Sequence, residues 1–389
     1  MKKKILYFTS HPIQYFSPLF KELDKKTDLK VYYYSNLKGT KDKGFNQKIN
    51  WDTPLLEGYK FQFLKNYTKN LSMDNRFFDA INPSVVKVLM RSESKIVIVN
   101  GWSYFSNWLV FIFGKLFGKE IWLRAESPLN QELKLSKNKL FLKKFFLKHL
   151  LFKYFIHKFL YIGSENKKFY EFFGVKNSSR LIYTPYSVDN DFFYSEFNKY
   201  QHKIVELKEQ LHIPINKKII LFSGKFIPKK NPMHLLEAFK IFNNVNYYLI
   251  FMGEGELREK MEEFIKNNTL KNVILTGFIN QSEVSKYYAI CDVFVMCSGV
   301  GETWGLSVNE AMNFEKPVIV SNTCGCSFDL VKYGENGFIY NEGDIKTLSS
   351  YLDITLNNDV FRKKAGELSS IIIQDFSIDK IVENIISVN

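Results

Sequence analysis

Cysteine and long apolar runs are scarce in this sequence of 389 residues. It has 4 cysteines, and only Cys324-Gly325-Cys326 contains a close pair. No second pair or histidine cluster completes a zinc site, so we expect free thiols in a reducing compartment. The apolar run Ile5 to Phe8 is too short for a signal-peptide core, and Trp108 to Phe113 is too short for a membrane span. The sequence therefore predicts a cytoplasmic protein, either soluble or peripheral on the inner face of the membrane.

Acidic residues are also few relative to basic ones. Lys+Arg 54 against Asp+Glu 40 gives a formal net charge of +14. Such a charge favours an anionic partner, for which a nucleotide sugar, an acidic lipid surface and a nucleic acid are all suitable. Charge alone does not choose among them, and a biased codon supply can account for part of the lysine content.

One stretch, from Leu133 to Ser164, has no Asp or Glu at all, and lysines alternate there with phenylalanines. At about 100° per residue, a helix places the rings of residues 141, 145, 152 and 159 within a narrow arc. Lys148 falls close to the same arc, so the amphipathic pattern is imperfect. The stretch 133–159 therefore predicts either a surface that docks on anionic lipid or a partly buried helix with a solvated basic edge.

The remaining chain alternates short apolar strands with helices, as in a doubly wound α/β fold. The stretch 298–312 shows this best. A strand at 293–296 leads into a glycine-rich loop, then into a helix at 306–314 and a strand at 318–320. The amide groups at the start of that helix form an anion site. Glu302 and Glu310 add two carboxylates, which accept hydrogen bonds from hydroxyl groups. The pattern favours a ligand that is part phosphate and part sugar, although an ordinary loop with surface glutamates remains the alternative.

The spacing Glu302-x7-Glu310, with Gly305 between and Lys316-Pro317-Val318-Ile319 after, resembles the signature of retaining glycosyltransferases of family 4. The resemblance covers nearly the whole chain. It implies the GT-B fold, in which two doubly wound Rossmann-like domains face a cleft. We expect an acceptor-binding domain at 1–195, a nucleotide-sugar-binding domain at 196–375, and a terminal helix at 376–389 that crosses back to the first domain.

The resemblance also assigns donor-binding residues. Glu302 would hold sugar hydroxyls and Glu310 the ribose diol, while Lys225 and Lys230 would meet the diphosphate. Lysine replaces the family's usual arginine at 225, and it lacks that residue's bidentate fork. A solvated basic turn is the alternative there. The remaining predicted donor-binding residues are Gly224, Gly253, Gly277, Phe278, Thr303, Trp304, Gly305 and Leu306.

Glu302, Glu126 and His11 are the predicted catalytic residues. His11 follows the first strand, where it either faces the ligand or caps the turn. Glu126 stands near the place of a histidine in several relatives; it either accepts a proton from the acceptor hydroxyl or pairs with Arg124. No Asp-x-Asp pair is suitably placed for a divalent metal, so we expect no metal and no cofactor.

The sequence thus predicts a retaining glycosyltransferase that moves a sugar from a nucleotide diphosphate donor to a glycan or lipid-linked acceptor. A UDP-sugar is favoured, a GDP-sugar is possible, and the pathway expected is that of a bacterial surface polysaccharide. The alternative is a nonenzymatic protein that binds anions or nucleic acid through its basic surface. It leaves the paired carboxylates unexplained, and the sequence has no nucleic-acid motif.

Overall fold

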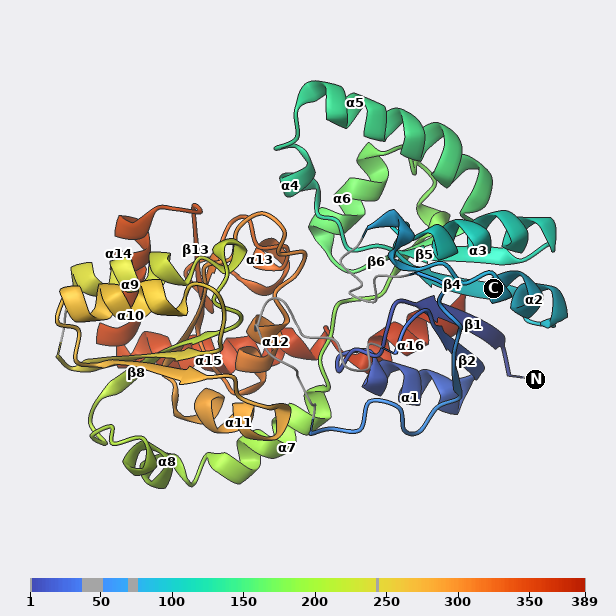
Figure 1. Cartoon of the computed structure of the whole chain (residues 1–389). Coiled ribbons are helices and arrows are strands. Elements are labelled where there is room, and N and C mark those ends of the chain that lie inside the picture. Colours follow the sequence, from blue (N-terminus) through green and yellow to red (C-terminus); the bar gives the residue numbers. More distant parts are fainter. Residues whose placement is uncertain (1, 37–51, 69–75, 243–244, 389) are drawn as a thin grey trace. The chain divides into compact units, whose positions relative to one another are not determined.

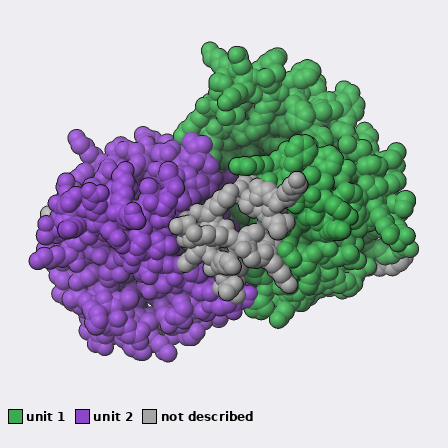
Figure 2. Space-filling view, in the orientation of Figure 1, with its two compact units in different colours: residues 1–40, 54–186, 378–389 green, residues 41–53, 187–377 purple. Residues whose placement is uncertain are grey.

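The computed structural model describes residues 2–36, 52–68, 76–242 and 245–388 (Figure 1). Contacts divide the chain into two compact units (Figure 2). Unit 1 comprises residues 1–40, 54–186 and 378–389, and unit 2 comprises residues 41–53 and 187–377. The final segment therefore returns to the unit in which the chain begins.

Unit 1 is built on a parallel sheet of seven strands in the order β3-β2-β1-β4-β5-β6-β7. Its strands read as continuous apolar runs because helices cover both faces, as in doubly wound folds. The strands are β1 (Lys4–Thr9), β2 (Asp28–Tyr33), β3 (Phe61–Phe63), β4 (Ile96–Asn100), β5 (Glu120–Arg124), β6 (Lys158–Tyr161) and β7 (Leu181–Tyr183). The helices are α1 (Ser17–Lys26), η1 (Phe77–Asp79), α2 (Ser84–Arg91), α3 (Phe105–Leu116), α4 (Leu129–Glu132), α5 (Lys137–Phe146), η2 (Leu147–Phe155), α6 (Ser164–Phe172), η3 (Ser178–Arg180) and α16 (Ile378–Ser387).

Helices α1 and α16 cover one face of this sheet. Phe20 of α1 and Ile381 and Ile385 of α16 are fully or almost fully buried in one apolar cluster with the strands. On the other face, Val85 and Leu89 of α2 pack in a second cluster. Helix α16 thus supplies part of the unit 1 core, as expected for a terminal helix that crosses back.

Unit 2 contains a parallel sheet of six strands in the order β10-β9-β8-β11-β12-β13. This is the order of the dinucleotide-binding Rossmann fold. Its strands are β8 (Lys218–Ser223), β9 (Tyr247–Met252), β10 (Val273–Gly277), β11 (Val293–Met296), β12 (Val318–Ser321) and β13 (Gly337–Tyr340). Its helices are α7 (Asn190–Tyr200), α8 (Ile204–Gln210), η4 (Pro228–Lys230), α9 (Pro232–Phe242), α10 (Arg258–Asn267), α11 (Gln281–Ile290), α12 (Leu306–Asn313), α13 (Ser327–Leu330), α14 (Ile345–Asn357) and α15 (Asp359–Gln374).

The structure differs from the sequence-based expectation at the junction of the units. The boundary expected at residue 195 falls inside α7, which belongs to unit 2, and the unit changes after Tyr186. Two helices follow this boundary, α7 (Asn190–Tyr200) and α8 (Ile204–Gln210). Asp189 begins α7 by accepting a hydrogen bond from the Phe192 amide at 3.0 Å, a capping signal that the sequence analysis did not use.

The lysine-rich stretch is not one regular helix. Helix α5 continues into η2, a π-helix of 9 residues, and the chain then enters β6. Phe141 and Phe145 are 69% and 62% exposed, whereas Phe152 and Phe159 are buried. The arc expected for these rings was therefore wrong, because the wider π-helical turn and the following strand change the direction of the later side chains.

Within the described part of the chain, no helix is both long enough and apolar enough to cross a lipid bilayer.

Candidate functional site

The candidate site lies at the carboxyl edge of the unit 2 sheet. Strands β8 and β11 are neighbours in this sheet. After β8 the chain continues to β9, toward one edge of the sheet, and after β11 it continues to β12, toward the other edge. Such a topological switch point is where open α/β sheets bind ligands. The loop after β8 carries Lys225 and Lys230, and the loop after β11 carries Glu302 and Gly305.

Lys230 and Glu302 form an ion pair at this switch point. Their side chains are 15% and 12% exposed. Burial raises the pKa of Glu302, but the charges of Lys230 and Lys229, with hydrogen bonds from Lys230 and Ser298, lower it below the ordinary carboxyl value. The site therefore holds an ionised carboxylate at neutral pH, directly beside a lysine ammonium group.

The two loops are also joined through backbone groups. The Gly299 amide donates to the Lys229 carbonyl at 2.8 Å, and the Lys229 ammonium donates to the Gly301 carbonyl at 3.2 Å. Lys225 is half-buried in the same β8–α9 loop. Three lysines thus lie in the loop after β8, and their positive charges suit an anionic ligand.

Gly305 precedes α12 in a left-handed conformation, with φ of 106°. A side chain there would be strained, and its Cβ would lie only 2.8 Å from the Cys324 sulfur. The glycine allows the chain to turn sharply into α12, whose first amides then lack helical partners. These amides and the positive end of the helix dipole are the expected anion site.

The segment Cys324-Gly325-Cys326 supports this loop. A Cβ on Gly325 would lie 1.8 Å from the Thr303 carbonyl oxygen, so the two backbones touch. The Gly325 amide donates to the Glu302 carbonyl at 3.2 Å, and the Cys324 thiol donates to the Trp304 carbonyl at 2.8 Å. The sulfur atoms of Cys324 and Cys326 lie 3.7 Å apart, and both thiols therefore have a structural role under the loop.

Backbone contacts between glycines connect the ends of β8, β9 and β10, the first three strands of unit 2. A Cβ on Gly253 would lie 1.9 Å from the Gly224 carbonyl oxygen. The Gly253 amide donates to the Gly277 carbonyl at 3.0 Å, and the Gly224 amide donates to the Met252 carbonyl at the same distance. The three predicted glycines thus lie together, and at Gly253 only glycine permits the two backbones to approach so closely.

Glu310 lies on α12 with 4% of its surface exposed. One of its carboxylate oxygens, Oε2, accepts a hydrogen bond of 2.6 Å from the Tyr288 hydroxyl of α11. This contact orients the carboxyl group. Tyr288 was not among the predicted residues.

Trp304 contributes its backbone and not its side chain to the site. The indole is 2% exposed, and its N–H donates to Asn309 Oδ1 at 2.9 Å. Its ring also packs on Phe376, with ring centroids 5.8 Å apart. Thr303 and Leu306, on either side of Trp304-Gly305, are half-buried.

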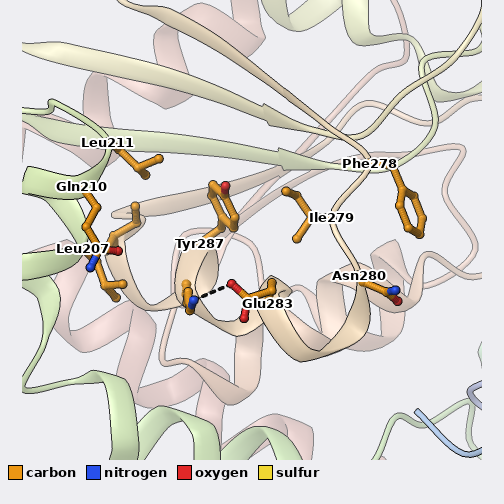
Figure 3. Close-up of a pocket in the computed structure, with 10 residues that line it drawn as sticks. Leu207, Gln210, Leu211, Phe278, Ile279, Asn280, Glu283 and Tyr287 are labelled. Carbon is orange, nitrogen blue, oxygen red and sulfur yellow. Dashed lines mark hydrogen bonds and ion pairs between the residues drawn. The ribbon is translucent and has the colours of Figure 1, made fainter. Parts of the chain in front are cut away.

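Phe278 borders a pocket of about 400 Å³ that extends along α11 (Figure 3). Figure 3 shows Phe278 at the end of β10, with Tyr287 of α11 near the middle and Leu207 and Leu211 at the α8 side. An ion pair between Lys286 and Glu283 lies at its border. Phe278, one of the predicted donor-binding residues, therefore adjoins a partly apolar pocket, and neither Lys230 nor Glu302 lines that pocket.

A carboxylate that the sequence analysis missed joins three loops of the site. Glu342, after β13, accepts hydrogen bonds from the Thr323 hydroxyl at 2.7 Å and from the side-chain amide nitrogen Nδ2 of Asn231 at 3.4 Å. A Cβ on Gly299 would lie 1.9 Å from its Oε1. No local pattern marks Glu342, because its partners come from distant parts of the chain.

In unit 1, Arg124 and Glu126 lie around Tyr186. The Arg124 guanidinium is 5.1 Å from the ring centres of both Phe16 and Tyr186. Burial, the charge of Glu126 and a hydrogen bond to that carboxylate raise the pKa of Tyr186 well above its ordinary value. Glu126 thus has a structural contact that the sequence did not predict. His11 is half-buried beyond the carboxyl end of β1, and its role stays a prediction.

The described residues include no cluster of side chains that could hold a metal ion. No group of three or more His, Cys, Asp or Glu side chains is arranged there to hold an ion. Metal independence stays a prediction.

The part of the chain that matches a known protein family lies within unit 2. Residues 203–370 match the family described as "Glycosyl transferases group 1". A capsular polysaccharide biosynthesis glycosyltransferase of Staphylococcus aureus is 29% identical over 178 residues, which are 44% of this chain and 45% of that protein. The chain therefore spans about half the length of such relatives.

A second relative comes from Campylobacter jejuni. It is an alpha-1,4-N-acetyl-D-galactosaminyltransferase whose name specifies a PP-undecaprenol glycan. The two proteins are 27% identical over 226 residues, covering 57% of this chain and 56% of that protein.

Solved structures match the chain over its whole length. A glycosyltransferase from Rickettsia africae aligns with a TM-score of 0.76 at 16% identity, covering 100% of this chain and 97% of that one. Anabaena HepE, solved with UDP and glucose, aligns with a TM-score of 0.71 at 16% identity, covering 99% and 98%. The predicted fold class, with two Rossmann-like α/β domains as in GT-B glycosyltransferases, is confirmed.

Proposed function

We propose that this protein is a retaining glycosyltransferase of family 4 that moves a sugar from a nucleoside diphosphate onto a glycan or lipid-linked acceptor. The observation that carries the proposal is the Lys230–Glu302 ion pair at the β8/β11 switch point, beside the N-terminus of α12. The match of residues 203–370 to group 1 glycosyl transferases supports the same reaction class. A UDP-sugar is the favoured donor and a GDP-sugar the alternative.

The site chemistry follows from its charges. Lys225, Lys230 and the first amides of α12 would bind the diphosphate and stabilise the negative charge that develops as it leaves. Glu302, ionised because of its lysine neighbours, would accept hydrogen bonds from sugar hydroxyls. In the free protein it neutralises Lys230, and the bound diphosphate would take over that role. The carboxylate is then available to the sugar.

The transfer itself breaks the bond between the anomeric carbon and the diphosphate oxygen, which leaves with the electron pair. The acceptor oxygen forms the new bond on the same face of the sugar, and its proton passes to the departing phosphate. No metal is required in this scheme, because lysine and amide groups meet the charge. His11 and Glu126 are the proposed acceptor-side residues, although Glu126 also holds Tyr186.

Glu310 would bind the ribose diol of the donor. The Tyr288 hydroxyl holds one carboxylate oxygen at 2.6 Å and so fixes the direction of the group. The other oxygen would accept hydrogen bonds from ribose. The backbone of Gly277-Phe278 would contact the base, near the pocket of Figure 3.

The product would be a bacterial surface polysaccharide made at the inner face of the cytoplasmic membrane. Two relatives support this part of the proposal, since one acts in capsular polysaccharide biosynthesis and the other carries PP-undecaprenol in its name. Exposed rings of α5, with exposed Lys137 and Lys139 beside them, would hold the protein on anionic lipid.

The test is a panel of UDP- and GDP-sugars in which slow donor hydrolysis is followed for the native protein and Lys230→Ala. One donor should be consumed. Lys230→Ala should bind both that donor and its free nucleoside diphosphate about tenfold or more weakly, the scale of a charge-assisted hydrogen bond. Lys332→Ala, which removes an exposed lysine of unit 2 outside the site, is the control. Unaltered diphosphate affinity in the Lys230 variant would remove that residue from the site.

A further inference from the structure

A groove of about 940 Å³ lies on unit 1, along one face of β1, β2 and β3 and beside α2. Leu6, Tyr32 and Leu64 lie on the sheet face that α2 covers. Helix α2 has only 8 residues and is therefore about 12 Å long. The helix packs against the apolar part of this face, and the side chains that begin the strands remain open beside it. The groove is at the opposite end of β1 from the loop that carries His11.

The groove is strongly basic. Its lining includes six cationic residues and two acidic ones, namely Lys4, Lys30, Lys60, Lys65, Lys87, Arg91, Asp28 and Glu93. Both acids are already neutralised, because Glu93 pairs with Lys4 and Asp28 pairs with Lys60 at 2.7 Å. The other four cations have no ion pair with a residue that the structure describes. They form an uncompensated positive strip that no step of the proposed reaction uses.

We propose that this groove binds an anionic polysaccharide, a chain that bears carboxylate, phosphate or sulfate groups. The choice of a polysaccharide rests on the proposed function, in which the acceptor or product is a glycan. The cations along the groove match a chain with repeated negative charges. Gln62, Ser84 and Ser92 line the same groove and supply hydrogen-bonding groups for sugar hydroxyls.

The shape and the aromatic residues distinguish this ligand from two other polyanions. A lipid surface is flat and would not bring headgroups to the floor of a groove. Single-stranded nucleic acid is usually held by stacking its bases on exposed rings. Here Tyr32 on the floor is 5% exposed, and Phe63 packs on Tyr33 with ring centroids 5.4 Å apart. An anionic glycan needs neither a flat surface nor a stacking platform.

Such a site would retain a growing chain between transfers. A glycan bound at the groove raises the effective concentration of its other segments near the protein. The retention is electrostatic, so it should weaken as salt rises and exposed charges are screened.

The experiment measures binding of a fluorescent heparin decasaccharide by anisotropy, with a neutral maltodextrin of equal length as the second probe. The variant combines Lys30→Ser, Lys87→Ser and Arg91→Ser. Its control combines Lys260→Ser, Lys266→Ser and Lys271→Ser, three exposed lysines of unit 2, so that both variants lose the same charge. Heparin should bind the groove variant about tenfold more weakly, the scale of three exposed ion pairs. The control should match the native protein, and maltodextrin should not bind.

If both variants lost the same heparin affinity, the net charge of the protein rather than the groove would explain heparin binding, and the proposal would be overturned. Groove-dependent binding of a single-stranded oligonucleotide more tightly than heparin would assign the groove to nucleic acid instead. Groove-dependent pelleting with anionic vesicles would assign it to lipid. Donor hydrolysis and nucleoside diphosphate affinity are measured on the same variants and should be unchanged. A protein without any donor turnover would reject the proposed function, whereas the heparin measurement needs no turnover and judges the groove alone.

Discussion

At the residue scale, Glu302 and Glu310 have different proposed roles, because Glu302 would contact the transferred sugar and Glu310 the ribose of the donor. Glu310→Gln keeps the shape but loses a charge-assisted hydrogen bond worth about 1.5–3 kcal/mol. The donor and the free nucleoside diphosphate should both bind roughly tenfold or more weakly. Calorimetry with UDP and with GDP measures this, and Glu335→Gln, at an exposed position of the same unit, is the control.

Glu302→Gln should behave differently because free nucleotide lacks the sugar that Glu302 would hold. The variant should bind nucleoside diphosphate nearly as well as the native protein, since Lys230 is then freed from its ion pair. Its turnover should fall, whether the loss lies in sugar positioning or in the transition state. Normal turnover in a transfer assay would sink the assignment of Glu302 to the sugar.

The lowered pKa of Glu302 also implies that the stability of the fold depends on pH. A carboxyl whose pKa is lower in the folded than in the unfolded chain stabilises the fold above its unfolded pKa. That contribution is lost as pH falls through the folded pKa. The difference in Tm between the native protein and Glu302→Gln should therefore be constant near neutral pH and shrink below about pH 4.5. Thermal unfolding at a series of pH values tests this, and a difference that grows on acidification contradicts it.

The cysteines should be inert in the folded protein. All 4 are buried, and burial raises the pKa of Cys291 and of Cys297 to about 12. The thiolate is the reactive form, so iodoacetamide at neutral pH should label none of them until the chain unfolds. Mass spectrometry before and after denaturant measures the labelling. Rapid modification of Cys324 or Cys326 in the native state would show that the loop above them opens.

At the scale of the element, α5 combines exposed rings with exposed lysines. Phe141, Leu142 and Phe145 are 69%, 65% and 62% exposed. Changing all three to serine should reduce pelleting with anionic vesicles, because their apolar surface would no longer enter the lipid interface. The control changes Val360 and Ile371 of α15, 66% and 67% exposed, to serine. If the native protein pelleted equally well with neutral vesicles, electrostatic attraction of the exposed lysines to anionic lipid would be rejected.

The lysines of this element do not all face solvent. Lys143 pairs with Glu132 at 2.6 Å, and Lys144 lies 3.9 Å from the centre of the Phe172 ring. Replacing these two would disturb packing as well as charge. Lys137 and Lys139 are exposed and are the lysines to reverse to glutamate, with loss of vesicle binding expected and no change in Tm.

At the scale of the whole molecule, α16 makes the stability of unit 1 depend on the last residues described. Ile385 is 1% exposed and packs in the cluster that contains Leu19 and Leu23 of α1. Ile385→Ala should cost about 2–5 kcal/mol of unfolding free energy, as for other buried aliphatic truncations. Hydrogen exchange should accelerate in β1, β2 and α1 while β8 and β11 remain protected. Ile371→Ala, at an exposed position, should change neither.

Much of this organisation was determined by local sequence. Apolar runs predicted the parallel strands, because strands buried on both faces need continuous apolar side chains. Glycine and glutamate spacing predicted the loop before α12, since a left-handed residue such as Gly305 requires glycine. The short strands β3 and β13, of 3 and 4 residues, were not predicted.

Only the tertiary structure decided which distant groups meet. The Lys230–Glu302 ion pair, the Tyr288 hydroxyl on Glu310 and the Glu342 contacts join residues from separate loops and helices. The packing of the fold rather than sequence distance brings them together. The lysine-rich stretch shows the same limit, since periodicity alone did not reveal that Phe152 turns into the core while Phe145 stays exposed. Side-chain patterns describe one element at a time, whereas burial and pairing depend on what packs against it.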